Sequence, residues 1–488
     1  MSTESFPIAG LRGSPSSTKT LSDLSSRCRR MPENEKLCRQ VLARLQFLHA
    51  FVAPLAVADL LKTQYTDVVV RFVKLLRRKP LLLRLASSET LVMTIRELQL
   101  KLSDVAQGLH VGDQPEATQW EAQWDEDRAE QLGKLNELVG GASERMLVNE
   151  FRGDKKVQEA LMNLHSGMNW KGQAPDMVAL KQNTFSRVSG YLNQAGLRMF
   201  DWFIPIDDVE FEDEAIGTRG TFGDVCRGSW LHDGERTSVA IKRLFPETSS
   251  ESDDAFLRQL ELWGGLPPNK HILKLYGGSH VSNPQFYVCE NAQHGSLVEF
   301  LEDDKHGGLF WRLFLQVAQG IEFLHSHKTV HGGLKCNNIL VDDQLTAKLA
   351  DFGFSTVRTL SAGLSQNASA TNAKSVRWKP KEVLEETGTE AARYESDVYS
   401  LAMCMIEAKT HEPPFGMDDD TVAMDKIMSG ARHERPDGLT DAEWDFISRL
   451  SDPDFTKRPK MDQVIKEISA FAEAEESSSP RQVLRRLV

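Results

Sequence analysis

The feature that most limits the possible folds is the spacing of apolar residues in the first third of the chain. Between residues 37 and 52, and again between 91 and 109, they recur at steps of three and four. This spacing places them on one face of an α-helix, where a narrow stripe is buried most simply against neighbouring helices. We therefore expect an all-α helical bundle. The two stripes comprise Leu37, Val41, Leu45, Leu48 and Val52, and Leu91, Ile95, Leu98, Leu102, Val105 and Leu109.

Changes in composition predict several domains, because 488 residues exceed what one hydrophobic core normally serves. Residues 1–32 are rich in Ser, Thr, Gly and Arg without an apolar period, so we expect a disordered segment. The helical bundle should occupy 33–170, and a polar linker or brace 171–200. Strand-like composition begins near residue 201, and we expect a second domain over 201–472 followed by a flexible tail over 473–488.

Charge is unevenly distributed along the chain. The net charge is -12, yet residues 27–101 carry 15 Lys and Arg against 6 Asp and Glu. A basic first part and an acidic remainder favour binding to an anionic membrane, above all through the basic segment 71–84, or docking between the two halves. Solvated helix faces explain the same charges, so both interpretations stay open.

Cysteines and apolar runs bear on the compartment. The six cysteines form no C-x-x-C pair, which argues for a reducing environment and against a disulfide framework or a zinc site. The most apolar stretch, residues 45–61, is interrupted by polar residues and by Pro54, and falls short of the ~20 apolar residues of a membrane span. We expect no secretory signal, and Ser2 excludes N-myristoylation at that position. These observations favour the cytoplasm and leave peripheral membrane association open.

Three motifs in the second half suit a phosphorylated ligand. A glycine-rich stretch, Ile216 to Val225, precedes Val239-Ala240-Ile241-Lys242. Glycines let the backbone approach phosphates closely, and a lysine supplies positive charge. Then follow His331-Gly332-Gly333-Leu334-Lys335-Cys336-Asn337-Asn338 and Asp351-Phe352-Gly353. In order and spacing these motifs resemble those of protein kinases, which implies an α+β bilobal kinase fold over residues 201–472.

The resemblance implies a role for each matching residue. Lys242 would contact the α- and β-phosphates of ATP, Lys335 the γ-phosphate, and Asn338 and Asp351 would hold Mg²⁺. A helix glutamate normally holds the lysine; the candidates are Glu261, which we prefer, and Gln259. The implied nucleotide-binding residues are Thr218, Gly220, Gly223, Val225, Ala240, Lys242, Glu261, the gatekeeper Cys289, the hinge residues Glu290 and Ala292, Lys335, Asn338 and Asp351.

One position departs from the kinase pattern in a way that bears on chemistry. Gly333 stands where the family has the aspartate that accepts the proton of the substrate hydroxyl, and Gly332 stands where it has arginine. A general base contributes roughly 10²–10⁴-fold to rate, and glycine cannot replace it. The catalytic aspartate is thus not intact, although Lys335 is retained. We therefore expect strongly reduced phosphate transfer with nucleotide binding retained.

Further landmarks support the resemblance. Arg377-Trp378-Lys379-Pro380-Lys381-Glu382 stands in the place of R-W-x-A-P-E, Asp397 opens a D-V-Y-S motif, and Arg458 is expected to pair with Glu382. These motifs resemble those of the tyrosine-kinase-like group, and Lys335 is typical of serine/threonine kinases. Residues 33–170 resemble the four-helix adaptor bundle of mixed-lineage-kinase-domain-like proteins. The loop between Phe354 and Ser375 is rich in Ser and Thr, which indicates a flexible loop or a phosphorylation switch.

Three functions remain open. The chain resembles a pseudokinase that binds ATP and Mg²⁺ and acts as a signalling switch or scaffold coupled to its helical bundle. It also fits an active serine/threonine kinase, or a membrane-acting bundle regulated by the kinase-like domain. We expect signalling proteins as partners and no nucleic acid, and oligomerisation stays open; substrate and activator are not readable from the sequence.

Overall fold

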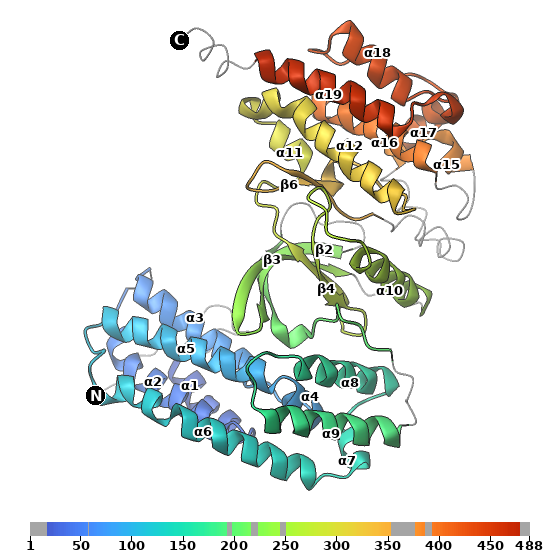
Figure 1. Cartoon of the computed structure of the whole chain (residues 1–488). Coiled ribbons are helices and arrows are strands. Elements are labelled where there is room, and N and C mark those ends of the chain that lie inside the picture. The colour runs from blue at the N-terminus through green and yellow to red at the C-terminus, as the bar shows by residue number, and fades with distance from the viewer. Residues whose placement is uncertain are drawn as a thin grey trace. The chain divides into compact units, whose positions relative to one another are not determined.

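The computed structural model describes residues 17–56, 58–192, 198–215, 223–244, 250–352, 376–385 and 393–478. The chain divides into two compact units: Met1–Glu210 with Ser229–Thr237, and Phe211–Gly228 with Ser238–Val488. The first is helical apart from the strand residues it includes, and the second contains the sheet and the remaining helices (Figure 1). The predicted order, an α-helical region followed by a two-lobed α+β domain, is confirmed.

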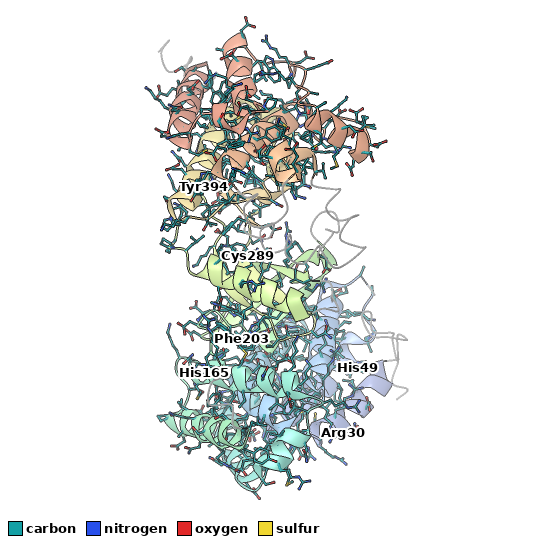
Figure 2. The ribbon with its side chains drawn as sticks, turned by 90° about the vertical axis from the view of Figure 1, so that its right-hand side faces the viewer. Arg30, His49, His165, Phe203, Cys289 and Tyr394 are labelled. Carbon is teal, nitrogen blue, oxygen red and sulfur yellow. The ribbon has the colours of Figure 1, made fainter. Side chains whose placement is uncertain are left out.

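Both predicted apolar stripes lie on helices of the first unit and are buried, with Leu109 partly buried. One apolar cluster is formed mainly by α1, α2, α3 and α5, and a second by α4, the end of α6, α7, α8 and α9. Figure 2 shows Arg30, His49 and His165 among these helices. Helices α1 to α9 span Ser17–Cys28, Glu35–Val52, Leu60–Leu75, Leu81–Ala86, Ser88–Gly108, Pro115–Gly140, Glu144–Asn149, Asp154–Met168 and Pro175–Tyr191.

Three boundaries differ from the expectation. Helix α1 lies inside the stretch predicted to be disordered, because Leu21, Leu24 and Cys28 are buried in the first apolar cluster. The linker or brace at 171–200 is largely the helix α9, whose Met177 and Val188 are buried. The last helix, α19, continues to Ser478, so it includes the first residues of the predicted tail.

One face of α5 contacts the 3₁₀ turn at Asp208 and the start of strand β3 (Glu235–Leu244) at Arg236, which both belong to the first unit. Thr90, Met93 and Glu97 are three and four residues apart, so they share a helix face. Thr90 Oγ1 donates to Asp208 at 2.5 Å, and Glu97 accepts from Arg236 Nε at 2.7 Å. The tip of the β2–β3 hairpin therefore belongs to the helical unit.

The basic segment 71–84 is partly neutralised within the same unit. Arg71 lies 3.2 Å from Glu97 and 3.0 Å from Glu210, Lys79 lies 2.7 Å from Asp207, and Arg84 lies 2.7 Å from Glu33. The side chains of Lys74, Arg77 and Arg78 are exposed.

The small lobe of the second unit is built on a five-stranded sheet with strand order β1-β2-β3-β5-β4 and the helix α10, Ser250–Gly264. The antiparallel β3–β5 register pairs Ala240 with Cys289 and Lys242 with Tyr287. Strands β1 to β5 span Val209–Ala215, Gly223–His232, Glu235–Leu244, Leu275–Ser279 and Phe286–Glu290.

The large lobe is mostly helical, with the short strands β6 and β7 at Ile339–Val341 and Ala347–Leu349. Helix α16 is buried from Ser396 to Ala408, as expected for a helix surrounded by others. Capping boxes of Ser296 with Glu299 and of Thr440 with Glu443 start α11 and α18. Helices α11, α12, α15, α16, α17, α18 and α19 span Leu297–Leu301, Phe310–Ser326, Lys381–Glu385, Tyr394–Thr410, Asp420–Met428, Asp441–Leu450 and Met461–Ser478, and α12 lies beside α19 (Figure 1).

Short 3₁₀ helices connect these elements at Ile206–Asp208, Asp304–Leu309, Cys336–Asn338, Val376–Trp378 and Phe455–Lys457. Among the described residues, no helix combines the length and the apolar character that crossing a membrane requires.

Candidate functional site

Strand β3 presents Lys242 to the segment that follows β7. The Lys242 ammonium forms an ion pair with Asp351 Oδ2, and both side chains are largely buried, at 13% and 23% exposure. Gly223 stands where β2 meets β3 so closely that an added Cβ would lie 2.0 Å from the Arg243 carbonyl oxygen, so only glycine fits there. The predicted phosphate-binding lysine and metal-binding aspartate are thus adjacent.

A tyrosine completes this pair. Tyr287, directly opposite Lys242 in β5, donates its hydroxyl proton to Asp351 Oδ1, so each oxygen of that carboxylate accepts a donor from the small lobe. Tyr287 belongs to none of the kinase motifs in the sequence. The signal was present, because alternate residues of a strand share a face and Tyr287 is two positions before Cys289.

Helix α10 brings Gln259 to the same segment. Its side chain is 2% exposed, and its Nε2 donates to the Phe352 carbonyl oxygen at 3.2 Å. Glu261 is half-buried two positions along the helix. Of the two candidates, Gln259 contacts the Asp351-Phe352 segment. The described ion pair of Lys242 is with Asp351. The pairing of Glu261 with Lys242 stays a prediction, and the ion pair with Asp351 does not favour it.

The loop around Gly333 is anchored from α16. Asp397 is fully buried and accepts the backbone N–H groups of His331 and Gly332, each at 2.8 Å, while His325 Nε2 lies 2.8 Å from its Oδ2. Gly332 has φ of 67°, a left-handed conformation that favours glycine. The loop therefore keeps its support although its acid is absent.

Gly333 itself has room for a side chain. Among the described residues, a Cβ built there would meet no atom within 4 Å, and the Gly333 N–H points to His331 Nδ1 at 3.3 Å. Asn338 Nδ2 donates to the Gly333 carbonyl oxygen at 2.8 Å. The part of the chain that the structure describes therefore leaves space for a Cβ at position 333.

The two predicted metal ligands come from neighbouring segments. The Ala350 N–H donates to the Asn338 carbonyl oxygen at 2.9 Å, which holds the residue before Asp351 beside Asn338. An amide oxygen and a carboxylate are oxygen ligands of the kind that Mg²⁺ prefers. The residues present therefore fit a Mg-nucleotide. Desolvation by burial lowers the pKa of Lys335, the other predicted phosphate contact.

The predicted hinge follows β5. Cys289 is 5% exposed, is labelled in Figure 2, and burial raises the pKa of its thiol. The Glu290 carboxylate lies 3.0 Å from Lys348 and accepts the Lys274 N–H at 2.7 Å, so its side chain supports the fold. The Ala292 carbonyl oxygen accepts from Gly295 at 3.2 Å. Cys289 is the cross-strand partner of Ala240, and its role as a gatekeeper stays a prediction.

The expected ion pair of the large lobe is confirmed. Arg458 Nη1 lies 2.6 Å from Glu382 Oε1, with side-chain exposures of 0% and 5%. Some predicted residues lie outside the described part of the chain, namely Thr218, Gly220, Gly353 and the loop Phe354 to Ser375. The structure brings Lys242, Lys335, Asn338 and Asp351 close to one another and pairs Ala240 with Cys289, while Gly223 and Val225 lie on β2.

Comparison with known proteins decides the family. The model for the protein tyrosine and serine/threonine kinase family matches residues 212–468, more than half of the chain. The chain belongs to this kinase family. The kinase match covers the sheet from within β1 onward, α10, and the large lobe as far as the first part of α19.

Individual kinases are similar at modest identity. A probable serine/threonine-protein kinase, drkD, of Dictyostelium discoideum is 31% identical over 276 residues, which cover 54% of this chain and 20% of that protein. MAP3K epsilon protein kinase 1 of Arabidopsis thaliana is 29% identical over 263 residues, or 52% and 18%. Fibroblast growth factor receptor 2 of Dugesia japonica is 24% identical over 290 residues, or 54% and 31%. In each case the matched part is less than a third of the relative's length.

Proposed function

We propose that this chain is a signalling pseudokinase whose serine/threonine-type kinase domain binds ATP with Mg²⁺ but transfers phosphate weakly or not at all. The observation that carries the proposal is Gly333, which lies in a loop anchored by Asp397 and beside Asn338. Lys242 and Asp351 would hold the nucleotide, and Mg²⁺ would neutralise phosphate charge there. The kinase domain would act as a switch or scaffold coupled to the helical region.

The finer family assignment is part of this proposal. The R-W-x-x-x-E motif from Arg377 to Glu382 and the sequence Cys336-Asn337-Asn338 support assignment to the tyrosine-kinase-like group. The succession of helices from α2 to α8 along the chain supports a resemblance to the adaptor bundle of mixed-lineage-kinase-domain-like proteins. Signalling proteins are the expected partners, and self-association is open.

Two measurements on the full chain test the proposal. Thermal unfolding with ATP and Mg²⁺ should show stabilisation, because a ligand that binds only the folded state raises its stability. Lys242→Ala should lose most of that shift, while Lys274→Ala, a lysine of the same lobe outside the site, should keep it. Phosphate incorporation from labelled ATP should stay near background. Absence of any nucleotide-dependent shift would remove the proposal.

An active serine/threonine kinase is the second candidate, and the name of the relative drkD, a probable serine/threonine-protein kinase, favours it. The transition state of phosphoryl transfer is loose, so positioning and charge supply most of the rate even without a base. Phosphate incorporation that exceeds background and disappears in Lys242→Ala would establish this function and displace the first.

Membrane binding by the helical region is the third candidate. Its specific support is the exposure of Lys74, Arg77 and Arg78, since clusters of cations attract anionic headgroups. Replacing all three by Gln should weaken binding of the full chain to phosphatidylserine vesicles. Gln at the exposed Arg29 and Arg30 serves as the control, and equal loss in both variants would argue against a dedicated surface.

A further inference from the structure

The Asp351 carboxylate is held by two side chains from neighbouring strands of the small lobe. Lys242 of β3 contacts Oδ2, and Tyr287 of β5 donates its hydroxyl proton to Oδ1. The two strand residues are cross-strand partners in the register, so both reach the same carboxylate from adjacent positions. A lysine at this place belongs to the kinase motif V-A-I-K, whereas none of the motifs quoted above includes the tyrosine.

The tyrosine ring is fixed by its neighbours. Tyr287 is 3% exposed, and its ring lies edge-on to Trp263 at 5.4 Å between centroids and parallel to Phe256 at 6.5 Å. Trp263 in turn contacts Phe352 at 5.1 Å and donates its Nε1–H to the Leu273 carbonyl oxygen at 3.0 Å. A ring held on several sides keeps its hydroxyl in one place, so the bond to Asp351 is a fixed feature of the site.

Asp351 has an unusual backbone conformation that such contacts explain. Its φ is 57°, in the left-handed region that non-glycine residues seldom adopt. Residues in such conformations persist where the surrounding structure holds them. Lys242 and Tyr287 hold the side chain of Asp351, and the Gln259 amide holds the Phe352 carbonyl group, so contacts from the small lobe hold this segment on both sides of the Asp351–Phe352 peptide.

These contacts bear on metal binding. Mg²⁺ requires near-octahedral oxygen ligands at short distance, so it tolerates little distortion of a ligating carboxylate. A hydrogen bond to a charged acceptor is stronger than one between neutral groups, and it withdraws electron density from the oxygen that a cation would use. Metal ligation by Asp351 must therefore work against the Tyr287 hydroxyl.

We propose that Tyr287 is a positioning residue that competes with the divalent cation for Asp351 and so raises the Mg²⁺ concentration at which this kinase domain binds ATP. The inference rests on the proposed nucleotide binding. Tyr287→Phe keeps the ring and its aromatic contacts and removes only the competing hydroxyl. Tyr287→Met removes the hydroxyl in a different way and serves as a second variant.

The test is a thermal-shift titration of the full chain with Mg²⁺ at a fixed ATP concentration. The Mg²⁺ midpoint should fall about tenfold in both Tyr287 variants, which corresponds to ~1.4 kcal/mol. Tyr276→Phe, a half-buried tyrosine of β4 in the same sheet, should leave the midpoint unchanged. The melting temperature without ligand is recorded as well, because a purely structural role would lower it and leave the Mg²⁺ midpoint unmoved.

The outcomes separate the two proposals. A lower midpoint in the two Tyr287 variants but not in Tyr276→Phe supports competition. A midpoint within about twofold of the natural chain in both variants overturns it and leaves nucleotide binding intact. If ATP stabilises neither the natural chain nor any variant at any Mg²⁺ concentration, nucleotide binding fails and this inference fails with it.

Discussion

Gln259 of α10 donates a hydrogen bond from its side-chain amide to the backbone carbonyl oxygen of Phe352 at 3.2 Å. An amide can donate to this carbonyl, and a carboxylate cannot. Phe352 directly follows Asp351, the residue with which Lys242 forms its described ion pair. Gln259 therefore stabilises the segment that carries Asp351.

Gln259→Glu tests the hydrogen bond from Gln259 to the Phe352 carbonyl oxygen. The change places a carboxylate beside the Phe352 carbonyl oxygen in a position that is 2% exposed, so the donor is lost and a charge is buried. We expect a loss of about 1–3 kcal/mol in unfolding free energy, measured by chemical denaturation. Arg258→Gln, exposed on the same helix, is the control and should change stability little. An unchanged stability in Gln259→Glu would contradict the assigned hydrogen bond.

Gly333→Asp should restore a proton acceptor without disturbing the fold, because a Cβ at this position meets no atom of the described residues within 4 Å. A general base contributes roughly 10²–10⁴-fold, so phosphate incorporation should rise by about 10² or more. The gain should vanish when Lys242→Ala is added. A variant that folds, binds ATP and still transfers no phosphate would show that the loop lacks more than its acid.

Asp397→Asn should loosen the loop that carries Gly333. The fully buried carboxylate accepts two backbone N–H groups at 2.8 Å, and an amide provides one acceptor oxygen in place of two. Breaking such a buried charged network costs about 2–4 kcal/mol. Hydrogen exchange should speed up at residues 331–333. Asp441→Asn, an almost fully exposed first-turn aspartate, provides the comparison, and similar exchange in both would count against the anchor.

Burial raises the pKa of Asp208 from 3.8 to about 7, and Thr90 donates to its carboxylate at 2.5 Å. Because the folded state holds this proton more tightly than the unfolded chain, the group's contribution to stability is fully present below about pH 4 and is lost as the pH rises through about 7. Asp208→Asn should remove this loss, so the variant gains about 2–4 kcal/mol relative to the natural chain between pH 4 and pH 8.

Asp207→Asn, which removes the neighbouring partner of Lys79, is the matched control for this pH profile. Both variants are compared by chemical denaturation of the full chain, followed through the helical signal. A parallel pH dependence in Asp208→Asn and the natural chain would show that Asp208 is ionised in the folded state near neutrality.

The Glu97–Arg236 pair should couple α5 to the β2–β3 hairpin. Their side chains are 26% and 23% exposed, so solvent screening reduces the interaction to about 1 kcal/mol in a double-mutant cycle of Glu97→Gln and Arg236→Gln. The cycle on Asp67 and Lys101, an exposed pair 2.9 Å apart between α3 and α5, should give less. Equal coupling in the two cycles would argue against a specific attachment of the hairpin.

Patterns with a strict period were readable from the sequence. The apolar stripes of α2 and α5 and the pairing of Arg458 with Glu382 follow from spacing and from the kinase resemblance. Helix α1 was missed because its polar composition outweighed a short stripe, although Leu21, Leu24 and Cys28 stand at steps of three and four. A three-residue stripe becomes informative only once a partner cluster is known.

The candidate site shows where sequence reasoning ends. Spacing could not separate Gln259 from Glu261, because residues two apart in a helix point in different directions and packing fixes the helix rotation. Tyr287 was overlooked because its contact with Asp351 joins segments 64 residues apart. The strand period placed its side chain on the correct face, but no local pattern reports which distant carboxylate it meets.

Strand β3 is divided between the two units: Glu235 to Thr237 belong with the helices, and the residues from Ser238 onward, Lys242 included, belong with the sheet. A shortened chain that begins at residue 211 would thus keep Arg236 and discard its anchoring glutamate on α5. A change in ATP affinity of such a fragment could then come from a disordered end of β3 as well as from the loss of regulation by the helical unit. Communication between the two units should therefore be measured on the full chain.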